Sequence, residues 1–187
     1  MHLPTHLAIS WLVGHKLPSR RDRLIVAFSG VLPDLDALAA LGGTELYSRW
    51  HHVLTHGLAA AVVLAVIVAA FSTQRGKTVA LCLVTFHLHL LCDLLGSGRE
   101  WGITYLGPFV DWEFFSPYGW GLASWQNTTI TMIAIGFSIR SGVLHGRTFA
   151  ECFLPARADA AVAAAFRARF GRLAGLAPDE GQPPAAG

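Results

Sequence analysis

Charged side chains are scarce in this sequence. Only 14% of its 187 residues are charged, whereas 53% are hydrophobic, and the mean hydropathy is +0.46. A soluble domain carries charge on about 25% of its residues. This deficit argues against a soluble globular protein, and the simplest solvent for such a chain is the lipid bilayer.

Basic charge and cysteine are also sparse. The net charge is only +2, and no basic stripe is interleaved with aromatic residues, so no nucleic-acid partner is expected. The three cysteines include no CxxC pair, and Cys82 and Cys92 lie in an apolar stretch, which predicts small core residues rather than a disulfide framework. The N-terminus has no basic region followed by a cleavable apolar core. Membrane insertion is therefore expected to use internal segments.

Long apolar runs are present in three places. The clearest covers residues 57–72 without a charge, and extension back through Val53 and Leu54 brings it close to the about 20 residues that a spanning helix needs. A second run, residues 78–96, contains histidines and an aspartate, and a third covers residues 123–139. These runs predict the long helices of the protein.

Shorter elements complete the predicted fold. Residues 7–13 and 24–32 are too short to cross a bilayer and predict an N-terminal helical hairpin. Residues 97–123 are rich in glycine and in aromatic rings, which favour the membrane interface. The predicted fold class is all-α, an integral membrane helical bundle with a short N-terminal hairpin and an aromatic-rich interfacial loop. We expect a membrane-embedded domain over residues 1–155, and an amphipathic helix with a disordered tail over residues 156–187.

Basic residues predict the orientation. They gather in the turn of the hairpin, before the second long run, and after the third, as Lys16, Arg20, Arg21, Arg23, Arg75, Lys77, Arg140, Arg147 and Arg157. If the chain reverses between these clusters, all three fall on one side, which the positive-inside rule makes cytoplasmic. The protein is thus expected to be multi-pass in the inner (plasma) membrane.

Four short clusters of histidine and aspartate carry the candidate chemistry. They are Thr5-His6, Pro33-Asp34-Leu35-Asp36, the segment HHVLTH from His51 to His56, and His89 with Asp93. The orientation above places them on the opposite, non-cytoplasmic side. All four therefore can contribute to one site.

The physical argument is strongest for His89 and Asp93. Residues i and i+4 of a helix face the same way and can share one ion, and His52 and His56 have the same spacing. A carboxylate in an apolar segment costs about 2.5–3.5 kcal/mol on insertion scales unless it is paired or ligated. Imidazole and carboxylate together suit zinc, manganese or iron, and more than four candidate ligands allow one or two ions.

Taken alone, each cluster also has a structural explanation. His89 and Asp93 can form a buried hydrogen-bonded couple, and the histidines of the 51–56 segment can lie at the interface without a ligand role. Asp34 and Asp36 can cap a helix, since aspartate is a favoured N-cap residue. Together, however, the four clusters favour a metal site.

Taken in order, TH near the N-terminus, PDLD, HHVLTHG and HLLCDLLGSG resemble the family of membrane-bound, metal-dependent hydrolases, also described as LexA-binding, inner-membrane-associated hydrolases. The resemblance spans roughly residues 4–115. His51 matches the histidine of the family, His52 stands where the family has arginine, and Gly57 where it has serine. The resemblance implies these metal ligands: His6, Asp34, His51, His56, His89 and Asp93. A more distant similarity, in motif style, to zinc-dependent phospholipase C and single-strand nucleases implies phosphoester chemistry.

These residues predict metal-assisted hydrolysis of a phosphoester or lipid-like substrate. A bound divalent ion, with zinc favoured over manganese or iron, lowers the pKa of its water toward about 7 and polarises the substrate oxygen. Asp36 is the candidate catalytic residue that orients or deprotonates this water. The expected partners are the lipid bilayer and a small-molecule or lipid substrate. The alternative is a non-catalytic membrane protein for metal binding, transport or regulation, because intramembrane histidine and aspartate also form ion pathways.

Overall fold

The structure, a computed structural model, describes residues 1–176. Within these residues the regular elements are helices, and one isolated bridge joins Ile103 to Phe114. The all-α prediction is therefore confirmed for the described part of the chain. The predicted disordered tail, residues 178–187, lies outside the described residues. The chain forms two compact units whose boundary falls between Ile135 and Gly136.

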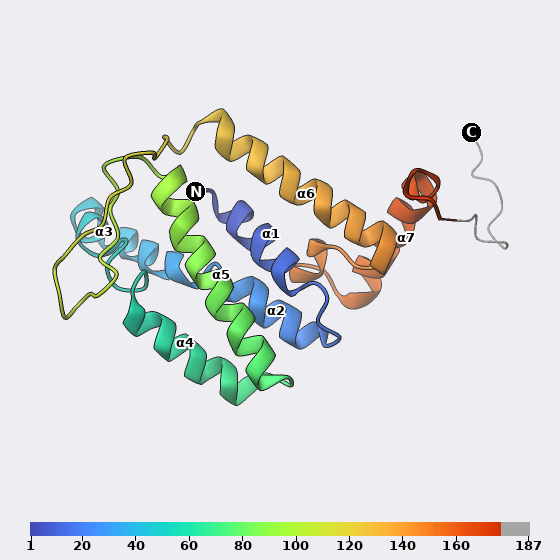
Figure 1. Cartoon of the computed structure of the whole chain (residues 1–187), viewed down its shortest axis with the longest axis horizontal. Helices are drawn as coiled ribbons and strands as arrows, with labels where there is room; N and C mark the ends of the chain where they lie inside the picture. Colours follow the sequence, from blue (N-terminus) through green and yellow to red (C-terminus); the bar gives the residue numbers. More distant parts are fainter. Residues whose placement is uncertain (177–187) are drawn as a thin grey trace. The chain divides into compact units, whose positions relative to one another are not determined.

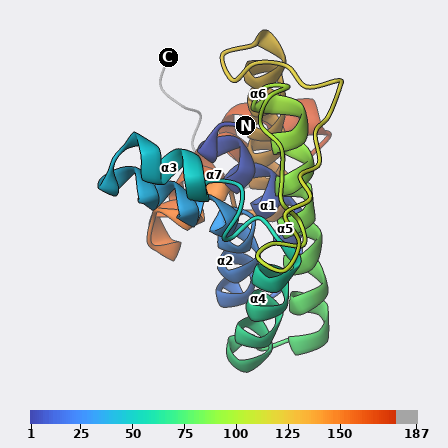
Figure 2. The same cartoon turned by 90° about the vertical axis from the view of Figure 1, so that its left-hand side faces the viewer.

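The first unit is a bundle of helices. α1, α2, α4 and α5 lie side by side, while the 3-10 helix η1, α3 and the loop after α5 gather where α5 ends (Figures 1 and 2). The predicted N-terminal hairpin is confirmed, with α1 and α2 packed on each other and on α5. In chain order the elements are α1 (Leu3–Gly14), α2 (Arg20–Ser29), η1 (Leu32–Gly42), α3 (Thr44–Trp50), α4 (Leu58–Phe71), α5 (Arg75–Gly96) and the start of α6 (Trp125–His145).

The buried face of α5 forms the centre of this unit. Cys82, Phe86 and Leu90 recur every four residues and are buried in one apolar stripe. Burying a side chain such as Phe86 stabilises the fold by about 1.5–3 kcal/mol. His89 and Asp93 continue the same buried stripe. Core packing of α5 therefore directs these two polar side chains into the interior.

Asp22 of α2 ties the hairpin to the start of α5. Its carboxylate accepts hydrogen bonds from the backbone N–H groups of Thr73 (2.9 Å) and Gln74 (3.0 Å) and from the hydroxyls of Thr73 (2.7 Å) and Thr78 (3.2 Å). Such bonds satisfy donors that a helix leaves unpaired at its N-terminus. They also place the first two basic clusters, in the hairpin turn and before the second long run, at the same end of the unit, and the cytoplasmic side of this end stays a prediction.

Candidate membrane spans are fewer than predicted. Among the described residues, α5, with 22 residues, is the one helix long and apolar enough to cross a membrane, and α2 with η1, bent by 53°, qualifies as a broken second span. α4 has 14 residues, below the about 20 that a span needs. Its expected extension through Val53 and Leu54 is wrong, because residues 51–57 form an irregular segment.

The second unit contains the end of α6 and the helices that follow it. These are η2 (Phe149–Cys152), α7 (Ala156–Phe170) and η3 (Arg172–Ala174). Asp159 accepts hydrogen bonds from the backbone N–H (3.1 Å) and the hydroxyl (2.6 Å) of Thr148, which fixes the turn before η2. α7 confirms the helix predicted from Arg157 onward, and the domain boundary predicted after residue 155 stays a prediction.

Candidate metal centre

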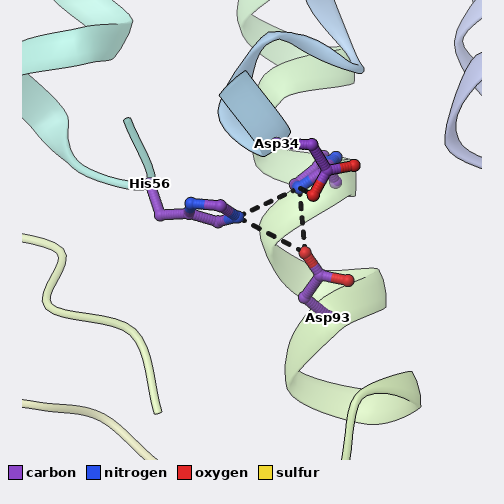
Figure 3. A group of neighbouring side chains, drawn as sticks. Asp34, His56 and Asp93 are labelled. Atoms are coloured by element: carbon purple, nitrogen blue, oxygen red, sulfur yellow. Dashed lines mark hydrogen bonds and ion pairs between the residues drawn. The ribbon is translucent and has the colours of Figure 1, made fainter. Parts of the chain in front are cut away.

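Four side chains from three segments converge inside the first unit. Asp34 comes from η1, His56 from the 51–57 segment, and His89 and Asp93 from α5. One ligand atom of each lies within 4.8 Å of the others, and Figure 3 shows the His56 ring pointing between the carboxylates of Asp34 and Asp93. The last three residues are buried, whereas the side chain of Asp34 is 20% exposed. The cluster therefore meets solvent at Asp34.

His89 is oriented by a main-chain carbonyl. Its Nδ1–H donates to the carbonyl oxygen of Gly30 at 2.8 Å, so in the neutral ring Nε2 carries the lone pair. Gly30 is required here because a Cβ would lie 1.7 Å from the Ser10 hydroxyl oxygen. The absence of a side chain thus lets α1 and the end of α2 pack closely enough to present this carbonyl to α5.

His56 is oriented by a carboxylate. Its Nδ1–H donates to Asp36 Oδ2 at 2.8 Å, an arrangement typical of histidines that bind metal through Nε2. Burial alone lowers the pKa of His56, but hydrogen bonds to Asp36 and Asp93 outweigh it and raise the pKa to about 9. The two carboxylates therefore attract positive charge to Nε2, where a divalent cation can replace the proton.

The distances between the converging atoms fit a single ion. His89 Nε2 lies 2.8 Å from Asp93 Oδ2, 3.2 Å from His56 Nε2 and 3.6 Å from Asp34 Oδ1. Metal–ligand bonds of about 2.0–2.1 Å at tetrahedral angles separate ligand atoms by roughly 3.4 Å. Asp93 Oδ2 is buried and, despite the short distance to His89, accepts no hydrogen bond of normal geometry. Once His56 has lost its proton, the lone pairs of all four groups face a shared point, as the ligands of one cation do.

Asp36, the candidate catalytic residue, is not one of the four converging side chains. It contacts the Nδ1 side of the His56 ring, away from the ligand atoms. Its Oδ1 accepts a hydrogen bond from His51 Nδ1–H at 2.7 Å. Its Oδ2 accepts hydrogen bonds from the backbone N–H of His52 at 3.0 Å and from His56 Nδ1–H at 2.8 Å. The carboxylate thus orders the whole 51–56 segment.

His6 and His51, two further predicted ligands, lie next to the group but outside it. His6 Nε2 is 3.2 Å from Asp93 Oδ1, its ring stacks on His89 at 3.8 Å between centroids, and burial lowers its pKa. His51 contacts Asp36 and stacks on Tyr47 at 4.5 Å. A ligand role for His6 or His51 stays a prediction.

The sequence pattern missed several groups that contact the site. The carbonyls of Gly30 and Gly102 leave no signal in residue type, but Ser97 follows Asp93 by one helical turn, and its hydroxyl donates to Asp93 Oδ1 at 3.0 Å. The helical relation predicted for His52 and His56 is wrong, because both lie in the irregular 51–57 segment.

Gly57 stands where the resemblance implies serine, and the structure leaves little room for a side chain there. A Cβ at this position would lie 2.8 Å from the carbonyl oxygen of Tyr105. The same carbonyl accepts a hydrogen bond from the backbone N–H of Leu58 at 2.8 Å, which attaches the start of α4 to the loop after α5. Glycine therefore lets the loop pack directly against the segment that carries His56.

The fold and the site together define the class of this protein: a helical bundle with a candidate divalent-metal centre, formed by buried imidazole and carboxylate groups at one end. A family model described as YdjM inner membrane protein matches residues 1–175. The chain belongs to this family, which supports the predicted inner-membrane localisation. No curated protein and no solved structure matches the chain. The number of membrane passes and the side that carries the centre stay predictions.

Proposed function

We propose that this protein is a membrane-bound, metal-dependent hydrolase whose centre is formed by Asp34, His56, His89 and Asp93. One observation carries the proposal: the Nε2 atoms of His56 and His89 lie 3.2 Å apart, and each Nδ1–H is already donated to an acceptor. The Met1 ammonium is paired with Asp93 Oδ1, but Asp93 Oδ2, Asp34 and the two nitrogens still face one another, which is costly in an apolar interior unless a further cation neutralises them. Zinc is the ion we expect, with manganese or iron as alternatives.

The residues around the centre have separable roles. When bound, the ion supplies a polarising charge and an activated water. Asp36 holds His56 in the orientation for binding, and both of its oxygens already accept hydrogen bonds. We therefore assign Asp36 to positioning rather than to deprotonation of water. Asp34, the partly exposed member, lies where water and substrate reach the centre.

The loop after α5 supports an amphiphilic substrate. Phe109 and Tyr118 expose 83% and 80% of their surface, and Trp112 exposes 60%. Aromatic side chains exposed in this way favour the membrane–water interface. Trp101 of the same loop lies against the rings of His51 and His52. A phosphoester or lipid-like substrate entering from the bilayer surface fits this arrangement.

The proposal is tested with the full-length protein purified in detergent. Elemental analysis is expected to find stoichiometric metal in the wild type and little in His89→Ala or Asp93→Asn. His87→Ala is the matched control, because His87 lies on the exposed face of the same helix. Full metal occupancy in the double variant of His89 and Asp93 would exclude this centre.

The catalytic part is tested separately. Chromogenic phosphoesters and fluorogenic phospholipids are offered to the metal-loaded protein, with and without a chelator. Hydrolysis that stops on chelation and in Asp93→Asn is the expected result. Stoichiometric metal without turnover of any of these substrates would favour the non-catalytic alternative of metal binding, transport or regulation.

A further inference from the structure

His52 adopts a backbone conformation that is rare for a residue with a side chain. Its φ is 67°, in the left-handed region, which is unfavourable for a non-glycine residue. Two hydrogen bonds hold it there: the His52 N–H donates to Asp36 Oδ2 at 3.0 Å, and the Thr104 N–H donates to the His52 carbonyl at 3.3 Å. The surrounding structure therefore imposes this conformation on His52.

The imposed conformation brings the His52 ring to the metal centre. The ring is buried, 4.4 Å from the ring of His56 between centroids. Its Nδ1 lies 3.2 Å from the carbonyl oxygen of Gly102, which can only accept, so Nδ1 carries the hydrogen. The lone pair is thus on Nε2, which lies 3.9 Å from Asp93 Oδ2. His52 therefore has the same arrangement as His56 and His89: its Nδ1–H donates to an acceptor, and its Nε2 faces Asp93.

We propose that His52 is a third imidazole ligand of the metal ion, through Nε2. This inference rests on the metal centre of the proposed function. The Nε2 atoms of His89, His56 and His52 lie 2.8, 3.5 and 3.9 Å from Asp93 Oδ2, so this oxygen is their common neighbour. Three imidazoles and two carboxylates exceed a tetrahedral set, so the ion is expected to be five- or six-coordinate.

The test removes the imidazole and keeps the backbone. Asparagine tolerates the left-handed region, so His52→Asn is the variant of choice, and His52→Gly replaces it should it fail to fold. His87→Asn is the control. Full-length proteins in detergent are loaded with zinc, and X-ray absorption counts the imidazoles around each zinc ion. We expect three in the wild type and in the control, two in the variant, and a loss of zinc affinity of about tenfold or more.

Each outcome has a distinct meaning. An unchanged imidazole count with unchanged zinc affinity in His52→Asn and His52→Gly would overturn the role of His52 and leave the proposed centre intact. A wild-type protein that binds no stoichiometric zinc, manganese or iron would instead overturn the centre itself. Replacement of zinc by cobalt gives an independent readout, because the weak visible absorption of five- or six-coordinate cobalt should become stronger when His52 is removed and the ion approaches tetrahedral geometry.

Discussion

His56 and His89 lie 33 residues apart in the sequence, yet their Nε2 atoms are 3.2 Å from each other. The Nδ1–H of each ring donates a hydrogen bond on the opposite side, His56 to the Asp36 carboxylate and His89 to the Gly30 carbonyl. Orientation of this kind fixes which nitrogen faces a metal and how basic it is. The acceptors behind the two rings should therefore matter almost as much as the rings themselves.

Replacing Asp36 tests the positioning of His56. Asp36→Asn keeps the size of the side chain but removes the negative charge of the group that accepts three hydrogen bonds. Metal affinity, measured by competition with a chelator, is expected to fall about 10–100-fold. Asp111→Asn, on an exposed loop carboxylate, should leave the affinity unchanged. Equal affinities of the Asp36 variant and the wild type would contradict a positioning role.

Adding one methyl group at Gly30 tests the orientation of His89. The new Cβ would meet the Ser10 hydroxyl at 1.7 Å and the Ser10 Cβ at 2.6 Å, so α1 and α2 must move apart. The free energy of unfolding is expected to fall by about 1–3 kcal/mol, as overpacking typically costs. Metal affinity should fall as well, since the carbonyl that accepts from His89 shifts.

The matched control for this change is Gly76→Ala in α5. No atom lies within 4 Å of the Cβ that this substitution adds. Alanine in a helix is favoured over glycine by about 0.5–1 kcal/mol, so the control is expected to stabilise slightly. Chemical denaturation measures both variants, and a Gly30→Ala protein as stable as the wild type would refute the close approach of α1 and α2.

Removing the Asp22 carboxylate separates stability from the metal centre. Asp22→Ala leaves the backbone donors of Thr73 and Gln74 without their buried acceptor. The expected loss in the free energy of unfolding is about 3 kcal/mol, because hydrogen bonds to charged groups are worth about 1.5–3 kcal/mol each. Metal content per folded protein should stay that of the wild type. A loss of metal without a loss of stability would contradict this assignment.

Zinc binding should release a proton. The pKa of His56 is raised from 6.5 to about 9, so proton binding favours the metal-free fold fully below pH 6.5, and this contribution disappears as the pH rises through about 9. The ion needs the Nε2 that holds this proton. We therefore expect release of about one proton at pH 7, and an affinity that rises with pH and levels off above about pH 9.

Calorimetry in buffers of different ionisation enthalpy measures the proton release directly. Asp36→Asn provides the control, because it removes one of the two carboxylates that raise the pKa of His56. The release at pH 7 should shrink in this variant. Binding to the wild type at pH 7 without proton release would mean that His56 is already neutral or is not a ligand.

The sequence by itself determined the features that follow from local periodicity. The spacing of His89 and Asp93 was sufficient to place both on one helix face, because helix geometry converts a separation of four residues directly into a shared direction. Composition and apolar runs likewise predicted the all-α fold, the N-terminal hairpin and α5. The length of α4 was overestimated, because the apolar run was extended back through Val53 and Leu54, past Thr55 and His56, although the helix begins only at Leu58.

Tertiary structure alone decided that His52 turns toward Asp93 beside His56, whereas His51 does not. The family resemblance favoured His51, but the backbone of this segment is set by Asp36 and Thr104, which are distant in sequence. These contacts hold His52 in a left-handed conformation, which only a few per cent of non-glycine residues adopt. The acceptors behind His52 and His89 are main-chain carbonyls, which every residue possesses. Their positions depend on how the helices pack, so only the folded chain could reveal them.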